Sequence, residues 1–191
     1  AHNADIRYLP HTLVRQITAD RQLSLLSRTA GAQPLQVKAQ YILLATGAQE
    51  RSFPLPGWTL PGAMTVGAAQ LLMKSAGLLP PTNSVLVGNG PLLLLFAAQV
   101  LRAGGRLQAI LDTTQYRDYL HSVPYLPRAL RHASQPLFKG LNLLREIKRA
   151  GVPYLSGVTQ IAIQGEHAVR GIQYQHRKKS HRLSTSSVLS H

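Results

Sequence analysis

The first third of the chain alternates apolar and polar residues in three short stretches. Residues 12–18 and 22–28 are two strand candidates, and residues 35–45 form a third that becomes wholly apolar at residues 41–45. This pattern predicts a β-meander that leads into a buried strand. Residues 51–62 contain three prolines, which require an extended connection, so we expect a domain boundary here.

The middle of the chain switches to a pattern of strand, helix and strand. Small and apolar residues at helical spacing predict a helix over Met64–Ala76, ended by Gly77. A β-branched strand follows at residues 84–87, and an apolar helix at residues 92–101. A second strand at residues 107–111 ends in Asp112. Strands that alternate with helices predict an α/β fold with a parallel sheet.

The last third contains one helix and two further strands. Leu137, Leu141, Leu144 and Ile147 form one helical stripe, and Gly151 ends that helix. Residues 157–164 and 168–175 are strand candidates joined by a hairpin turn at residues 165–167. We therefore expect three parts: residues 1–56, residues 57–175, and a basic, serine-rich tail at residues 176–191.

The turn Gly88-Asn89-Gly90-Pro91 carries the most specific chemistry. Glycines after a buried strand let a dinucleotide pyrophosphate approach the start of a helix, and Asp112, 24 residues after Gly88, is placed to accept a ribose hydroxyl. The third glycine of the usual pattern is Leu93 here, and Pro91 suits a first helical position but removes one N–H. A βαβ turn without a ligand remains the alternative.

Composition excludes several classes of protein. Hydrophobic residues make up 45% of the chain and charged residues 15%, which supports a buried core. Because the chain has no cysteine, disulfides, cysteine-bound metals and thiol redox chemistry are excluded. The apolar run at residues 92–100 is too short to span a bilayer, and no signal peptide is evident, so we expect no transmembrane segment and a cytoplasmic location.

The net charge of +14 raises the question of a nucleic-acid partner. Basic residues are dispersed except at residues 176–182, and no aromatic residues are interleaved with them, so we expect no nucleic-acid binding. His176 and His181 lack a companion carboxylate cluster, so we expect no metal site. Nucleophilic-serine and phosphoryl-transfer motifs are missing as well, which leaves redox cofactor binding.

Three segments together resemble a known family: residues 42–51, residues 53–62 and residues 88–94. They are similar to the FAD/NAD(P)-dependent oxidoreductases of the opine oxidase A subunit, the hydrogen cyanide synthase B subunit and the α subunits of heteromeric amino-acid dehydrogenases. The resemblance covers roughly residues 5–175. It implies a Rossmann-like, three-layer fold and part of a flavoprotein with two dinucleotide domains, related to pyridine nucleotide-disulfide oxidoreductases without the redox cysteines.

The resemblance also implies the cofactor contacts. Ala45, Thr46 and Gly47 would lie against FAD, and Glu50 and Arg51 would flank the crossover to the second domain. The second domain would bind NAD(P) or another adenine nucleotide through Gly88, Asn89, Gly90, Pro91 and Asp112. The expected N-terminal FAD fingerprint is not in this sequence, so the FAD site is incomplete, and residues 176–191 suggest a truncated or frameshifted end.

The activity implied by the resemblance is dehydrogenation of a C–N bond in an amino acid or opine. The flavin would carry out the hydride chemistry, and this subunit would relay electrons from a second flavoprotein subunit. No residue qualifies as a catalytic acid or base. Because the FAD site is incomplete, the chain alone is expected to be inactive. The alternative is a non-catalytic adenine-nucleotide-binding module, structural or regulatory, within a heteromeric dehydrogenase.

Overall fold

The computed structural model describes residues 6–29, 31, 33–47, 50–125, 131 and 134–191. Contacts divide the chain into two compact units, residues 1–49 and residues 50–191. The division falls before the proline-rich connection, and not after residue 56 as the sequence suggested. Because Leu55 is buried in the core of the second unit, the connection belongs to that unit.

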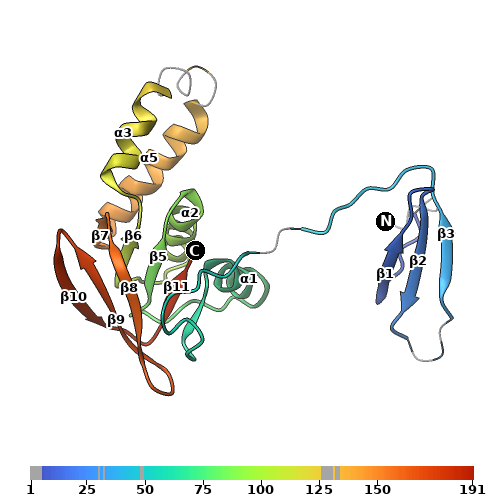
Figure 1. The fold of residues 1–191 in the computed structure, drawn as a ribbon, viewed down its shortest axis with the longest axis horizontal. Coiled ribbons are helices and arrows are strands. Elements are labelled where there is room, and N and C mark those ends of the chain that lie inside the picture. The colour runs from blue at the N-terminus through green and yellow to red at the C-terminus, as the bar shows by residue number, and fades with distance from the viewer. Residues whose placement is uncertain (1–5, 30, 32, 48–49, 126–130, 132–133) are drawn as a thin grey trace. The chain divides into compact units, whose positions relative to one another are not determined.

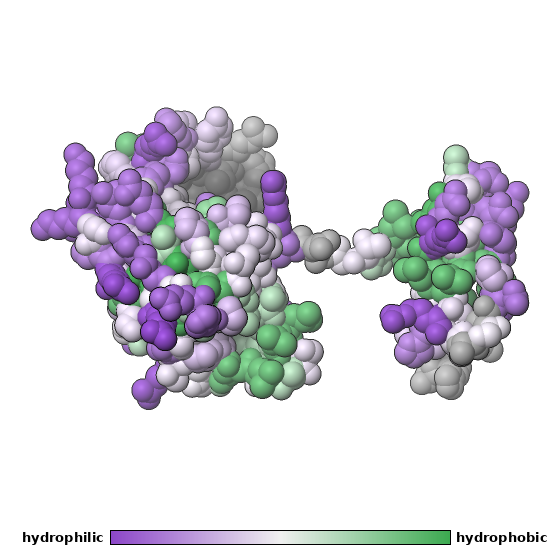
Figure 2. Space-filling model, turned by 60° about the horizontal axis from the view of Figure 1, so that its bottom comes forward, coloured by the Kyte–Doolittle hydropathy of each residue, from purple (hydrophilic) through white to green (hydrophobic). Residues whose placement is uncertain are grey.

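The first unit contains the predicted meander. β1 (Thr12–Ile17), β2 (Gln22–Ser27) and β3 (Leu35–Lys38) form an antiparallel sheet in the order β1-β2-β3 (Figure 1). Leu25 pairs with Val14 on one side and with Leu35 on the other, which aligns apolar side chains across the three strands. Several of these side chains are exposed, and green apolar atoms are visible on the surface of this unit in Figure 2.

The prediction of a buried strand at residues 41–45 is wrong for this structure. These residues adopt no regular structure, and the side chains of Tyr41 and Leu43 are 90% and 91% exposed. A strand is stable only when a neighbouring strand pairs with its backbone, and none of the described strands pairs with this segment. Apolar composition alone therefore did not determine the conformation.

The second unit is built around a parallel sheet in the order β4-β11-β5-β6-β7 (Figure 1). The strands are β4 (Ala63–Thr65), β11 (Val188–Ser190), β5 (Val85–Gly88), β6 (Ala109–Asp112) and β7 (Tyr154–Ser156). β5 and β6 are buried along their whole length, which explains their continuous apolar sequences. The chain runs from β5 outward to β7 and later returns to β11 on the other side of β5.

Helices cover one face of this sheet. They are α1 (Val66–Ala76), α2 (Pro91–Arg102) and α5 (Ser134–Arg149). The short α3 (Tyr116–Ser122) and the 3₁₀ helix η1 (Val123–Tyr125) follow β6 and bury none of their residues. Phe96, Val100 and Ile147 pack with sheet residues in one buried cluster. The helix predicted over residues 64–76 begins at Val66, because residues 63–65 pair with β11 as a strand.

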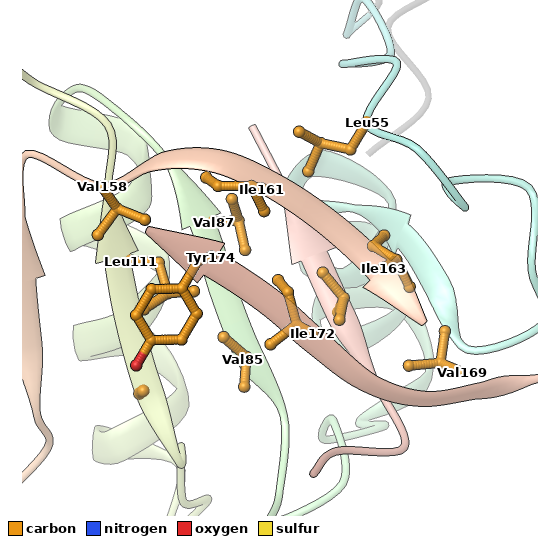
Figure 3. Close-up of a cluster of buried hydrophobic side chains, with 12 residues drawn as sticks. Leu55, Val85, Val87, Leu111, Val158, Ile161, Ile163, Val169, Ile172 and Tyr174 are labelled. Atoms are coloured by element: carbon orange, nitrogen blue, oxygen red, sulfur yellow. The ribbon is translucent and has the colours of Figure 1, made fainter. Parts of the chain in front are cut away.

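A second, antiparallel sheet covers the opposite face. β8 (Thr159–Gly165), β9 (Val169–His176) and β10 (Lys179–Ser184) have the order β10-β9-β8. Ile161, Ile163 and Ile172 pack against Val87 and Leu111 of the parallel sheet (Figure 3). The result is a layer of helices, a parallel sheet and an antiparallel sheet, which confirms the Rossmann-like, three-layer α/β fold.

Residues 176–191 are not a tail in this structure. Residues 179–184 form β10, and residues 188–190 form β11, which pairs with both β4 and β5. Val188 and Leu189 are fully buried. The sequence signal was weak because Leu183, Val188 and Leu189 are the only strongly apolar residues at positions 176–191, and the strands with which β11 pairs lie about a hundred residues or more earlier in the chain.

Candidate functional site

The glycine turn lies at the carboxyl end of β5, where the strand order reverses between β5 and β11. Ligands of open α/β sheets bind at such a reversal. Gly90 is the N-cap of α2 with φ +84°, no side chain caps the helix, and a Cβ on Gly90 would meet open space. The first N–H groups of α2 are therefore free of a side-chain cap, and uncapped N–H groups at the start of a helix can bind an anion such as a phosphate.

The first glycine of the turn has a structural reason of its own. Gly88 adopts φ +145°, and a Cβ there would collide with the backbone carbonyl of His191, just after β11. The His191 N–H also donates to the carbonyl of Val87 at 2.9 Å. Gly88 is thus required by the packing of two neighbouring strands, whereas Gly90 faces the open side of the turn.

Asp112 ends β6 next to this turn, but its carboxylate is buried and fully engaged. Oδ1 accepts hydrogen bonds from the backbone N–H and the hydroxyl of Thr114, at 2.8 and 2.6 Å. Oδ2 accepts from the hydroxyls of Tyr154 and Tyr119, the latter at 3.4 Å. Burial, followed by the bond to Asp112, raises the pKa of Tyr154 well above its usual value, which keeps the hydroxyl a donor.

Tyr154, which donates to this carboxylate, also lines a pocket of about 450 Å³. The residues that line this pocket come from three segments of the second unit and include Tyr116, Ser156, His176 and Arg177. Nothing in the sequence indicated this pocket, because it depends on β7 and the β9–β10 hairpin meeting beyond the end of β6.

The residues predicted to contact FAD lie partly in the first unit. Ala45, Thr46 and Gly47 are exposed and adopt no regular structure, and Gly47 has φ +77°. Arg51 belongs to the second unit and is exposed. The two sets of residues thus fall in different units, and their contacts with a cofactor stay predictions.

Glu50 has partners that the sequence did not reveal. Its Oε2 accepts a hydrogen bond of 2.5 Å from the N–H of Gly67 in the first turn of α1, and its Oε1 lies 2.8 Å from Nδ1 of His191. A Cβ on Gly67 would collide with that carboxylate, which explains the glycine near the helix start. Thr65 caps the same helix through Ala68, so α1 begins with two oxygen acceptors.

Two negative findings limit the chemistry of the described residues. Among them, no group of three or more His, Asp or Glu side chains is arranged to hold a metal ion. In the same part of the chain, no helix is both long and apolar enough to cross a membrane.

Comparison with known proteins finds relatives of this sequence. No protein-family model matches it. It is 37% identical to the opine oxidase A subunit from Rhizobium meliloti and 39% identical to that from Agrobacterium tumefaciens, over 97% and 93% of this chain. It is also 37% identical to the HcnB subunit of hydrogen cyanide synthase from Pseudomonas aeruginosa, over 69% of this chain.

The chain is a homologue of the opine oxidase A subunit and of HcnB. It spans only about a third of the length of these relatives, 36% for the Rhizobium protein and 35% for the Agrobacterium protein. The match to the Rhizobium protein covers 97% of this chain, so most of residues 176–191 lie inside it.

Solved structures agree on the fold. A ferredoxin reductase from Rhodopseudomonas palustris matches 94% of this chain and 40% of its own, with a TM-score of 0.57 and 21% identity. An FAD-dependent pyridine nucleotide-disulphide oxidoreductase from Desulfovibrio vulgaris matches 94% of this chain and 42% of its own, with a TM-score of 0.52 and 17% identity. At these identities the solved structures show the fold of the chain.

Proposed function

We propose that residues 50–191 form the second nucleotide-binding domain of a flavin-dependent oxidoreductase subunit. The observation that carries this proposal is the uncapped start of α2 after Gly88 to Pro91, at the reversal point of a parallel sheet. In this proposal Gly88, Asn89, Gly90 and Pro91 surround the pyrophosphate of an adenine nucleotide, and Asp112 lies at the ribose.

FAD is the proposed cofactor of the larger assembly. Residues 45–47, Glu50 and Arg51 are proposed to contact it, and the flavin would supply the hydride chemistry when bound. Residues 41–44 form an exposed apolar segment, and such side chains are normally covered by other parts of a protein. We propose that the remaining length found in the relatives pairs with this segment and completes the FAD domain.

The proposed reaction is dehydrogenation of a C–N bond in an amino acid or opine. It follows from the names of the relatives, which are subunits of opine oxidase and hydrogen cyanide synthase. In this proposal a second flavoprotein subunit binds the substrate, the present one relays the electrons in the cytoplasm, and the 191-residue chain alone is inactive.

The alternative is a non-catalytic adenine-nucleotide-binding module within such a complex. Two observations favour it: Leu93, which replaces the third glycine, is buried in the core, and Asp112 is engaged by protein groups. Both features reduce the resemblance of the site to a working nicotinamide site. Binding without hydride transfer is the outcome that separates this alternative from the first proposal.

Thermal unfolding with added nucleotides tests nucleotide binding. Trp58 is the only tryptophan in the chain and lies in the second unit, so its fluorescence reports on that unit alone. ADP, FAD and NADH should each raise the unfolding temperature, because a ligand that binds only the folded state stabilises it. Adenosine, which lacks phosphates, is the control and should have little effect; no shift with any phosphate-bearing nucleotide would refute the proposal.

A second measurement separates the catalytic proposal from the alternative. The protein purified with its partner should contain flavin, and an amino acid or opine should bleach the flavin absorbance under anaerobic conditions. Flavin that stays oxidised with every substrate of this class, in a complex that still binds ADP, would support the non-catalytic module.

A further inference from the structure

We propose that Tyr154 determines which groups of a nucleotide the second nucleotide domain recognises. Its hydroxyl donates to the carboxylate oxygen of Asp112 to which a ribose hydroxyl would otherwise donate. The inference rests on the proposed nucleotide site at the glycine turn and deepens it. It makes Tyr154 a specificity-determining residue that acts through Asp112.

The hydrogen bonds of Asp112 leave no acceptor site for a ribose. An ionised carboxylate has about four lone-pair positions. Thr114 occupies two of them through its N–H and its hydroxyl, and the hydroxyls of Tyr119 and Tyr154 occupy the others. Asp112 is only 3% exposed, so a ribose hydroxyl can bond to it only after one of these donors moves.

Tyr154 is the donor whose removal opens the carboxylate. The two bonds from Thr114 belong to a local turn two residues along the chain, and the bond from Tyr119 is long at 3.4 Å. Tyr154 is different because it comes from the neighbouring strand. Tyr154 pairs with Ile110 in the β6–β7 register, which places it diagonal to Asp112 on the same face of the sheet.

A pocket reaches the residue that holds this carboxylate. Tyr154 lines the pocket of about 450 Å³ and also donates from its hydroxyl to Asp112. Removing that hydroxyl would take one donor away from the carboxylate without removing the ring. With Tyr154 in place, we infer that the domain binds nucleotides through their phosphates and is indifferent to the ribose hydroxyls.

The test pairs a protein variant with a ligand variant. Binding of ADP and of 2′,3′-dideoxy-ADP is measured by isothermal titration calorimetry on the 191-residue chain and on Tyr154→Phe. The native chain should bind the two nucleotides with affinities that agree within about threefold. Tyr154→Phe should bind ADP at least about tenfold more tightly, which corresponds to about 1.4 kcal/mol, with no gain for the dideoxy nucleotide.

Tyr174→Phe is the matched control, since it removes a hydroxyl from a tyrosine packed on the opposite face of the sheet. It should leave ADP affinity unchanged. Stability provides a second readout: Tyr154→Phe should lower the unfolding temperature without ligand while it tightens ADP binding, and a purely structural tyrosine would not combine these opposite effects.

Each outcome separates the inference from the proposed function. Preference of the native chain for ADP over the dideoxy nucleotide, or equal ADP affinity in Tyr154→Phe and the native chain, would overturn the role of Tyr154 and leave the nucleotide site standing. Failure of every protein to bind either nucleotide would overturn both.

Discussion

The placement of β11 at the centre of the sheet gives the sharpest stability prediction. Leu189 is fully buried, and its strand has neighbours on both sides, so the surroundings cannot collapse into a cavity left by Leu189→Ala. Buried Leu→Ala substitutions cost about 2.7–5.0 kcal/mol, with the larger losses where the cavity persists. We therefore expect a loss of about 3–4 kcal/mol, which lowers the unfolding temperature by roughly 10 °C for a unit of this size.

The assay is urea unfolding followed by Trp58 fluorescence, which reports on the second unit. Leu71→Ala is the matched control, because Leu71 is 66% exposed on α1 and alanine is at least as good a helix former. The control should change stability by less than about 0.5 kcal/mol. The urea dependence of unfolding should be unchanged in both variants. Equal effects of the two substitutions would show that residues 188–190 do not belong to the sheet.

Three further predictions concern single contacts. Gly88→Ala should cost at least about 2 kcal/mol in urea unfolding, since its Cβ would collide with the His191 carbonyl; a neutral effect would contradict that packing. The hydrogen bond from Arg102 lowers the pKa of Glu146. The small stability difference between the native chain and Glu146→Gln should therefore be present at neutral pH, and it should vanish when acid protonates the carboxyl or when salt is added. A stability difference that responds to neither acid nor salt would refute the ion pair. Because folding raises the pKa of Tyr154, its contribution to stability is fully present below about pH 10 and is lost as the pH rises further. The stability advantage over Tyr154→Phe should therefore stay constant at neutral and mildly alkaline pH and shrink above about pH 10; an advantage that does not change with pH would contradict the raised pKa.

Local patterns allowed much of the fold to be predicted. The strand, glycine turn and helix from residue 84 to residue 101 follow from apolar periodicity and from two glycines and a proline, all within one short segment. The hairpin at residues 165–167 was likewise predicted from adjacent residues and is confirmed. Each of these elements is determined by residues that lie close together in the sequence.

The features that were missed depend on distant partners. β11 contains only three residues, and it is a strand because β4 and β5 flank it. The apolar residues 41–45 failed as a strand for the converse reason, since no described strand pairs with them. Hydrophobic composition can show that a segment should be buried, but the pairing partner determines where and whether this occurs.

In the candidate site, too, features set by neighbouring residues were predicted and contacts between distant residues were not. The sequence located Gly90 in the turn before a helix and Asp112 at the end of a strand, and in the structure Gly90 is the N-cap of α2 and Asp112 ends β6. It did not reveal that Tyr154, 42 residues after Asp112, donates to its carboxylate, or that Glu50 accepts from Gly67. Such contacts require the register of β6 against β7 and the path of the chain before α1.

The most direct test of the central claim is a map of where a nucleotide binds. Backbone amide resonances of the ¹⁵N-labelled chain are compared with and without ADP, with adenosine as the control. We predict the largest changes at Gly90, Leu92 and Leu93, whose N–H groups begin α2, and little change with adenosine. Changes confined to other parts of the chain, or no change at saturating ADP, would contradict the assignment of residues 50–191 as a nucleotide-binding domain.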